Sequence, residues 1–125
     1  MLTFKQQSDL GRWRSGLSGG DPAEIGPPQA RDWIASFNAL SEHHTGKSAV
    51  VTSWYRDDRT AHRGGHAVDF RRLSGANARF PKYTAQDVEA LETAAVGAGI
   101  PIVVIKRGTP SEHWHCGEIA TLAHE

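Results

Sequence analysis

The chain has 125 residues, which suits a single domain with one modest hydrophobic core. Fourteen Lys and Arg residues balance fourteen Asp and Glu residues, so the formal net charge is zero, whereas a nucleic-acid-binding domain usually carries a basic excess. No apolar stretch reaches the roughly 20 residues of a membrane-spanning helix, and the single cysteine, Cys116, excludes an internal disulfide. We therefore expect no nucleic-acid partner and no membrane span.

Residues 1–28 are polar and rich in glycine and proline, a composition typical of loops. They are too few to form a hydrophobic core of their own. We therefore expect an extended N-terminal arm over 1–28, held to the body by Trp13, Leu17 and Ile25, and one domain over 29–125. The first residues lack the apolar segment of a signal peptide, so a protein with a target outside the cell needs another delivery route or has lost its signal.

Two helices are predicted after the arm. Trp33, Phe37 and Leu40 recur at helical spacing and predict a helix over about 29–43. Thr84 and Asp87 form a capping-box pattern in front of an apolar face, which predicts a second helix over 85–98. These apolar faces indicate that both helices pack against a common core.

Four strands are predicted between and after the helices. Apolar runs favour short buried strands at 49–52 and 100–106. In a strand over 66–72, Asp69 faces the side opposite to Val68 and Phe70. A turn at 108–110 then leads to a last strand over 113–119, which favours antiparallel pairing of the final two strands. The predicted fold class is therefore α+β: a small, mostly antiparallel sheet flanked by helices.

Two short segments, 62–69 and 112–115, carry the residue types of a metal site. His62 ends a loop, Asp69 points in from a strand, and His115 shares a strand face with His113 because the two lie two residues apart. A catalytic zinc ion uses three protein ligands and keeps one position for water, whose pKa it lowers to about 7. We expect Zn²⁺ held by His62, Asp69 and His115 on the sheet.

A zinc-bound water also needs a general base, and the sequence offers two candidates. Glu112 lies three residues before His115, but strict strand alternation places it on the opposite face, so this role requires that it belongs to the turn. His113 is the competing candidate and could instead stabilise the oxyanion. Each motif alone has an ordinary structural explanation, and the metal hypothesis depends on their combination.

The pattern His62-x-x-Gly65-x-Ala67-x-Asp69, followed by His113-x-His115, resembles the signature of the zinc D-Ala-D-Ala carboxypeptidase and dipeptidase family. That family includes phage L-alanyl-D-glutamate endolysins and shares its fold with the signalling domain of hedgehog proteins. The resemblance spans about 50–119 and involves four separate segments in the right order.

Two of these segments flank the ligands. Ser53-Trp54-Tyr55-Arg56 resembles the family's Ser-Gly-Tyr-Arg segment, with Trp54 in place of Gly, and Glu112-His113-Trp114-His115 resembles its Glu-x-Trp-His segment. Thr60 stands where the family has Ser, and residues 1–28 have no counterpart. The short loop between Arg56 and His62 puts substrate specificity in question more than metal binding.

The resemblance implies an α+β fold and roles for individual residues. His62, Asp69 and His115 would hold zinc, Glu112 would act as the base, and Arg56 would bind and polarise the substrate carbonyl. Candidate substrate contacts are Ser53, Tyr55 and Trp114.

The expected function is hydrolysis of an amide bond in the peptidoglycan stem peptide by a zinc-dependent peptidase. D-Ala-D-Ala carboxypeptidase and L-Ala-D-Glu endolysin activities both stay open. The protein is expected to reach the bacterial cell wall after lysis or as part of a phage particle.

Two alternative functions use the same residue types or the same fold. Non-haem iron oxygenases also use two histidines and one carboxylate as metal ligands. Their sites normally lie in a longer all-β barrel, and the two predicted helices argue against such a fold. The other alternative is a non-catalytic cell-wall-binding or phage-particle structural module with the same fold.

Overall fold

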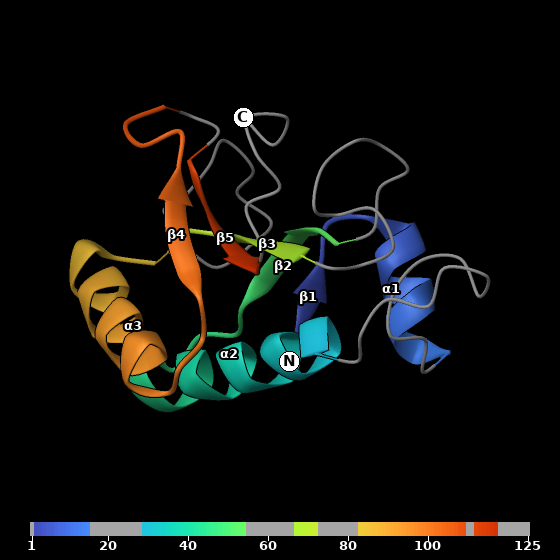
Figure 1. Ribbon diagram of the computed structural model, residues 1–125, viewed down its shortest axis with the longest axis horizontal. Coiled ribbons are helices and arrows are strands. Elements are labelled where there is room, and N and C mark those ends of the chain that lie inside the picture. Colours follow the sequence, from blue (N-terminus) through green and yellow to red (C-terminus); the bar gives the residue numbers. More distant parts are fainter. Residues whose placement is uncertain (1, 16–28, 55–66, 73–82, 110–111, 118–125) are drawn as a thin grey trace.

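The computed structural model describes residues 2–15, 29–54, 67–72, 83–109 and 112–117. These residues form three helices and one five-stranded sheet, so the predicted α+β class is confirmed (Figure 1). In chain order the elements are β1 (Thr3–Phe4), α1 (Gln7–Arg14), α2 (Gln29–Thr45), β2 (Val50–Ser53), β3 (Ala67–Arg71), α3 (Ala85–Gly97), β4 (Ile102–Ile105) and β5 (His113–Gly117).

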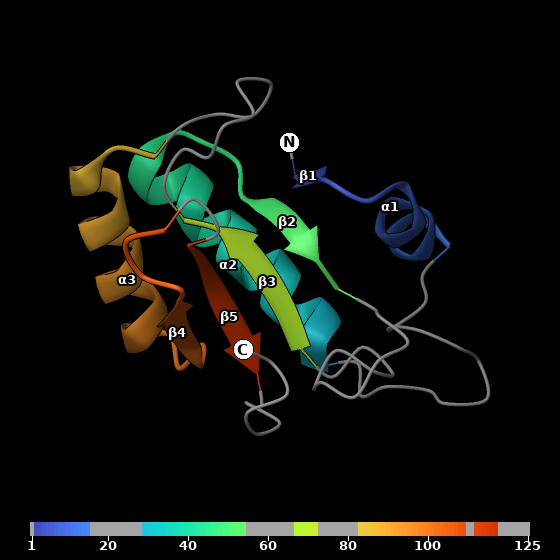
Figure 2. The ribbon, with the colours of Figure 1, turned by 90° about the horizontal axis from the view of Figure 1, so that it is seen from above.

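The strands lie in the order β1-β2-β3-β5-β4 (Figure 2). β1 pairs with β2 in parallel, and the other three pairs are antiparallel, so the sheet is mostly antiparallel as predicted. β5 is the last described strand along the chain, yet it lies between β3 and β4. The two strands that carry Asp69 and His115 are therefore direct neighbours in the middle of the sheet.

α2 and α3 lie along one side of the sheet, whereas α1 lies beside its β1 end (Figures 1 and 2). The capping box predicted at the start of α3 is present: the Asp87 N–H donates to Thr84 Oγ1, and the Thr84 N–H donates to Asp87 Oδ2, each at 3.0 Å. These two bonds satisfy backbone donors that the first turn of a helix leaves unpaired.

The core fills the layer between the sheet and α2 and α3. Phe37 of α2 stacks on Phe70 of β3, with ring centroids 4.2 Å apart. Trp114 of β5 packs edge-on against Phe37 at 5.2 Å and against Tyr83 at 5.7 Å. All four rings are nearly or fully buried, so aromatic packing fixes the two central strands on the helices.

The N-terminal segment departs from the predicted extended arm. Residues 3–4 add a strand to the sheet, because the Thr3 N–H donates to Ala49 O and the Lys5 N–H donates to Val51 O. Residues 7–14 form α1, and Trp13 contacts the body as predicted, with its ring 6.3 Å from that of Trp54. Leu17 and Ile25 lie outside the described residues.

The first half of residues 1–28 is thus an integral part of the domain. The contacts that hold it are made with residues near position 50, so the local composition does not reveal them.

Among the described helices, none has both the length and the apolar character needed to cross a membrane.

Candidate metal centre

Asp69 of β3 and His115 of β5 are direct partners across the antiparallel ladder. Side chains of such partners project from the same face of a sheet, and the residues two positions along share that face. The Asp69 Oδ1 atom lies 3.1 Å from His115 Nδ1, and Asp69 Oδ2 lies 3.6 Å from His113 Nε2. The structure therefore brings Asp69, His113 and His115 together, as strand alternation predicted.

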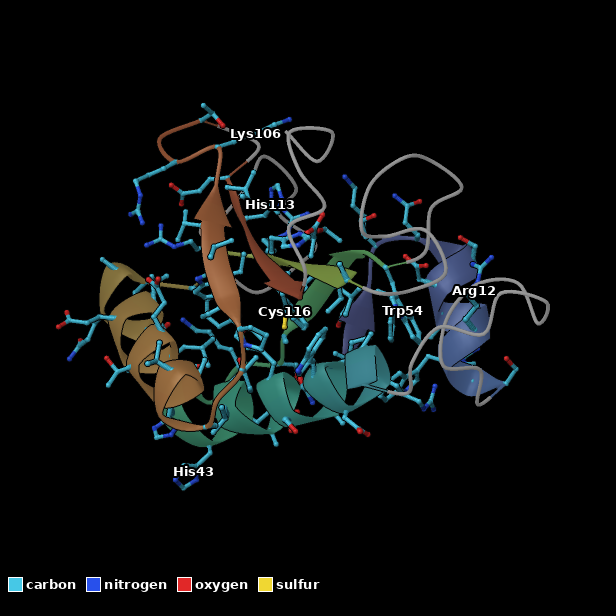
Figure 3. All side chains as sticks on the ribbon, viewed as in Figure 1. Arg12, His43, Trp54, Lys106, His113 and Cys116 are labelled. Atoms are coloured by element: carbon cyan, nitrogen blue, oxygen red, sulfur yellow. The ribbon has the colours of Figure 1, made fainter. Side chains whose placement is uncertain are left out.

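These three side chains project from the face of the sheet that is turned away from α2 and α3. Figure 3 shows His113 on that side and Cys116 on the helix side. The alternating positions Val68, Phe70, Trp114 and Cys116 belong to the hydrophobic core. Side chains alternate between the two faces along both strands, so the polar group lies on one face of the sheet and the core on the other.

The polar group is deeply buried. His115 is fully buried and Asp69 is 4 % exposed, whereas the His113 side chain keeps 17 % exposure. Burial of a carboxylate costs free energy unless positive charge, hydrogen bonds or a metal ion compensate it. A buried carboxylate beside a buried imidazole is therefore an arrangement suited to binding a cation.

The donor atoms fit zinc in type and in spacing. Zinc in proteins accepts carboxylate oxygen and imidazole nitrogen at about 2.0–2.2 Å, so two ligands of a tetrahedral centre lie about 3.3–3.6 Å apart. The observed 3.1 Å between Asp69 Oδ1 and His115 Nδ1 is slightly shorter than this separation and is a hydrogen-bond distance.

Two donors do not complete a zinc site. Within the parts of the chain that the structure describes, no group of three His, Cys, Asp or Glu side chains is arranged to hold a metal ion. A three-ligand centre at Asp69 and His115 therefore requires a donor from elsewhere in the chain. His62 is the predicted donor, and it lies outside the described residues.

The end of β2 borders the same site. Ser53, predicted as a substrate contact, is the register partner of Asp69 and is half-buried. The Thr52 hydroxyl donates to the Asp69 carbonyl oxygen at 3.3 Å. β2 therefore brings the backbone of Ser53 next to that of Asp69, with an irregularity in the register between Val51 and Ser53.

Glu112 is held elsewhere. Its Oε1 accepts a hydrogen bond of 2.9 Å from the Gly108 N–H, and its Oε2 accepts one of 2.7 Å from Arg72 Nη1. The Gly108 N–H, followed by Arg72, lowers the pKa of Glu112 against the opposing effect of burial. Arg72 also pairs with Glu92 of α3 at 3.0 Å, so the cluster lies on the helix side.

His113, and not Glu112, is therefore the group next to Asp69. Strand alternation predicted that Glu112 lies on the opposite face from His115, whereas the resemblance implied that Glu112 acts at the metal. Of the two candidate bases, the structure places His113 near Asp69 and engages Glu112 with Arg72 and Gly108.

Of the remaining predicted site residues, the structure describes Trp114, and this side chain does not join the group. Trp114 was expected to contact substrate, but it is fully buried in the core, because the even-numbered positions of β5 face the helices. Tyr55 and Arg56, like His62, lie outside the described residues.

Sequence reasoning overlooked Arg72 and Asp9. Arg72 directly follows β3 and has the same parity as Val68 and Phe70, so alternation places a charged residue on the core side, where it needs a buried partner. That signal was available from the sequence. The buried carboxylate of Asp9, which is 1 % exposed, gave no comparable signal because its partner lies 45 residues away.

Comparison of the chain with protein-family models, with curated proteins and with solved structures finds no match. The fold and the site define an α+β domain that carries a buried carboxylate–imidazole pair on the sheet face opposite its helices.

Proposed function

We propose that the protein is a zinc-dependent peptidase that hydrolyses an amide bond in the peptidoglycan stem peptide. The observation that carries the proposal is the cross-strand pair of Asp69 and His115, buried and 3.1 Å apart, with His113 beside it. The family resemblance of four sequence segments supports the same reading. The cell-wall target of this proposal rests on the resemblance.

In this proposal His62, Asp69 and His115 hold the zinc ion. When bound, zinc supplies a hydroxide at neutral pH and polarises the carbonyl that is attacked. Asp69 contributes negative charge that favours a cation, and its partner His115 is held in place by complete burial. A ligand fixed in this way binds metal with little loss of side-chain freedom.

His113 is the group assigned to proton transfer. Its Nε2 atom is buried 3.6 Å from Asp69 Oδ2, and the rest of its side chain keeps 17 % exposure. A neutral imidazole can accept a proton at Nε2 and later deliver it to the leaving amine. The Asp69 carboxylate would stabilise the imidazolium that forms between these two transfers.

Substrate binding is assigned to the segment that follows β2. Ser53 pairs with Asp69 in the sheet, and its hydroxyl is proposed to hydrogen-bond a peptide group of the substrate. Arg56 and Tyr55 follow it, and Arg56 is proposed to polarise the scissile carbonyl. The cleaved bond is D-Ala-D-Ala or L-Ala-D-Glu, and the enzyme would reach the wall after lysis or on a phage particle.

The test is digestion of purified peptidoglycan by the zinc-loaded protein, followed by mass spectrometry of the products. Release of free D-alanine identifies a carboxypeptidase, whereas a new amino group on D-glutamate identifies an L-Ala-D-Glu endolysin. The Asp69→Asn variant is the matched control, because it keeps the size of the side chain and removes the charge. Unchanged muropeptides from a protein that sediments with cell wall would instead favour the non-catalytic module.

A further inference from the structure

We propose that Arg72 and Glu112 are positioning residues, whose ion pair closes the β3–β5 ladder and thereby holds His113 against Asp69. The role of His113 in proton transfer rests on the proposed function. The role of the ion pair in positioning His113 rests on geometry alone. Under it, Glu112 acts through the position of His113 and takes no proton itself.

The ion pair stands at the end of the ladder. Arg71 and His113 are its last register partners, so Arg72 and Glu112 are the residues that immediately follow and precede them. Arg72 Nη1 lies 2.7 Å from Glu112 Oε2, and the two side chains are only 10 % and 8 % exposed. A short, charge-assisted bond thus joins the two strands just past the point where their regular pairing stops.

The pair also links three other parts of the domain. The second Arg72 nitrogen, Nη2, reaches Glu92 of α3 at 3.0 Å. Glu112 Oε1 accepts from the N–H of Gly108, in the turn after β4. Arg72 therefore holds α3 and β3 together, and Glu112 holds the turn to the start of β5.

His113 lies between two anchored neighbours. Glu112 before it is held by Arg72, and Trp114 after it is fixed in the core against Phe37 and Tyr83. Since successive side chains alternate across a strand, anchoring both neighbours on the helix side fixes His113 on the site side. Loss of the first anchor would free the start of β5 and shift His113 relative to Asp69.

The experiment compares Arg72→Met, Glu112→Met and the Arg72→Met/Glu112→Met double variant. Each single variant leaves a buried charge without its main partner, whereas the double variant replaces the pair with two apolar side chains of similar length. We expect kcat to fall by about 10²-fold in each single variant, with little change in KM, because a small misplacement can cost that much. The double variant should regain most of the lost rate.

A second readout does not depend on activity. Amide hydrogen exchange should accelerate in the single variants at Phe70 and Trp114, near the clamped end, more than at Val68 and Cys116, nearer the other end. The double variant should restore protection, and all variants should keep their zinc, because no ligand is changed. Glu92→Met is the control: its side chain is 31 % exposed and the Arg72–Glu112 pair remains, so both effects should be small.

Two results would overturn the inference. A double variant with restored exchange but no activity would show that Glu112 itself handles the proton. Uniform acceleration of exchange along β3 and β5 in the single variants would show a loss of global stability instead of a local clamp. If the wild type cleaves nothing, the proposed function fails, and the exchange pattern still decides whether the clamp exists.

Discussion

The Asp9 carboxylate in α1 accepts a hydrogen bond of 3.0 Å from the backbone N–H of Trp54, one residue past the end of β2. Asp9 is 1 % exposed and Trp54 is fully buried. The indole ring of Trp54 also packs edge-on against Trp13 of α1 at 6.3 Å. The N-terminal helix therefore fixes the point at which the chain leaves β2, next to Ser53.

Asp9→Ala is expected to destabilise the fold by about 1–3 kcal/mol, because the Trp54 N–H stays buried without this acceptor. Asp9→Asn should cost less, since its amide oxygen can still accept the bond. Urea unfolding measures both free energies. Glu89→Ala removes an exposed carboxylate from α3 and should change the stability by no more than about 0.5 kcal/mol. If Asp9→Ala and Glu89→Ala lowered the free energy of unfolding equally, Asp9 would not anchor the end of β2.

Asp69→Ala is expected to lose both zinc and hydrolysis, because it removes a proposed ligand from the buried pair. Arg56→Ala should keep its zinc, since a guanidinium stays protonated and cannot coordinate metal. Its turnover should fall by roughly 10²–10³, the usual effect of removing one donor to a developing oxyanion. Metal analysis after dialysis and muropeptide release provide the two readouts. Zinc lost from a folded Arg56→Ala protein would contradict the assigned ligands.

His113→Ala is expected to lower hydrolysis by roughly 10²–10⁴ and to leave zinc bound, since His113 is assigned to proton transfer. Glu112→Gln should be milder, because its amide oxygen can still accept a hydrogen bond from Arg72. Single-turnover rates at saturating zinc compare the two variants directly. The reverse order, with Glu112→Gln inactive and His113→Ala active, would restore Glu112 as the base.

The Cys116 thiol should resist modification in the folded protein. Burial, with a smaller effect from the charge of Asp69, raises its pKa from 9.0 to about 12, and the residue is fully buried. A thiol-specific reagent near neutral pH should therefore label the protein only after unfolding in urea. Because the folded pKa is raised, the associated stability is fully present below pH 9.0 and is lost as the pH rises towards 12. Rapid labelling of the native protein would contradict this burial.

Glu112 should contribute to the acid sensitivity of the fold. Its pKa lies below the ordinary 4.5, chiefly because the Gly108 N–H and then Arg72 stabilise the carboxylate. The associated stability is present above pH 4.5 and is lost as the pH falls through the lowered folded value. Unfolding free energies of wild type and Glu112→Gln should therefore converge below that pH. A constant difference across the whole acid range would assign the stabilisation to something other than this charge.

The elements that the sequence predicted well have local causes. The start of α3 follows from the Thr84–Asp87 capping box, and β3 and β5 follow from alternation that the structure reproduces. β1 and α1 were missed for the opposite reason. β1 is only two residues long and pairs with residues near position 50, and α1 contains Gly11 and many polar residues. Tertiary contacts, rather than local propensity, hold both in place.

The candidate site likewise combines features that a local pattern predicts with features that depend on tertiary contacts. The period of a strand predicted that His113 and His115 share one face and that Asp69 lies opposite Val68 and Phe70, and the pairing of β3 with β5 brings the three side chains together. The position of Glu112 did not follow from the resemblance, because its carboxylate is engaged by Arg72, whose role depends on which helix covers the sheet. Strand order places β5 beside β3, and no local pattern specifies that order.

The central place of β5 has a consequence for the order in which the sheet can form. β5 follows β3 and β4 in the chain but lies between them, so the sheet cannot be completed before residues 113–117 are available. His115 belongs to this strand, so the sheet is completed and His115 is paired with Asp69 in the same step. If the proposed zinc site exists, it can form only in a chain that extends past this strand.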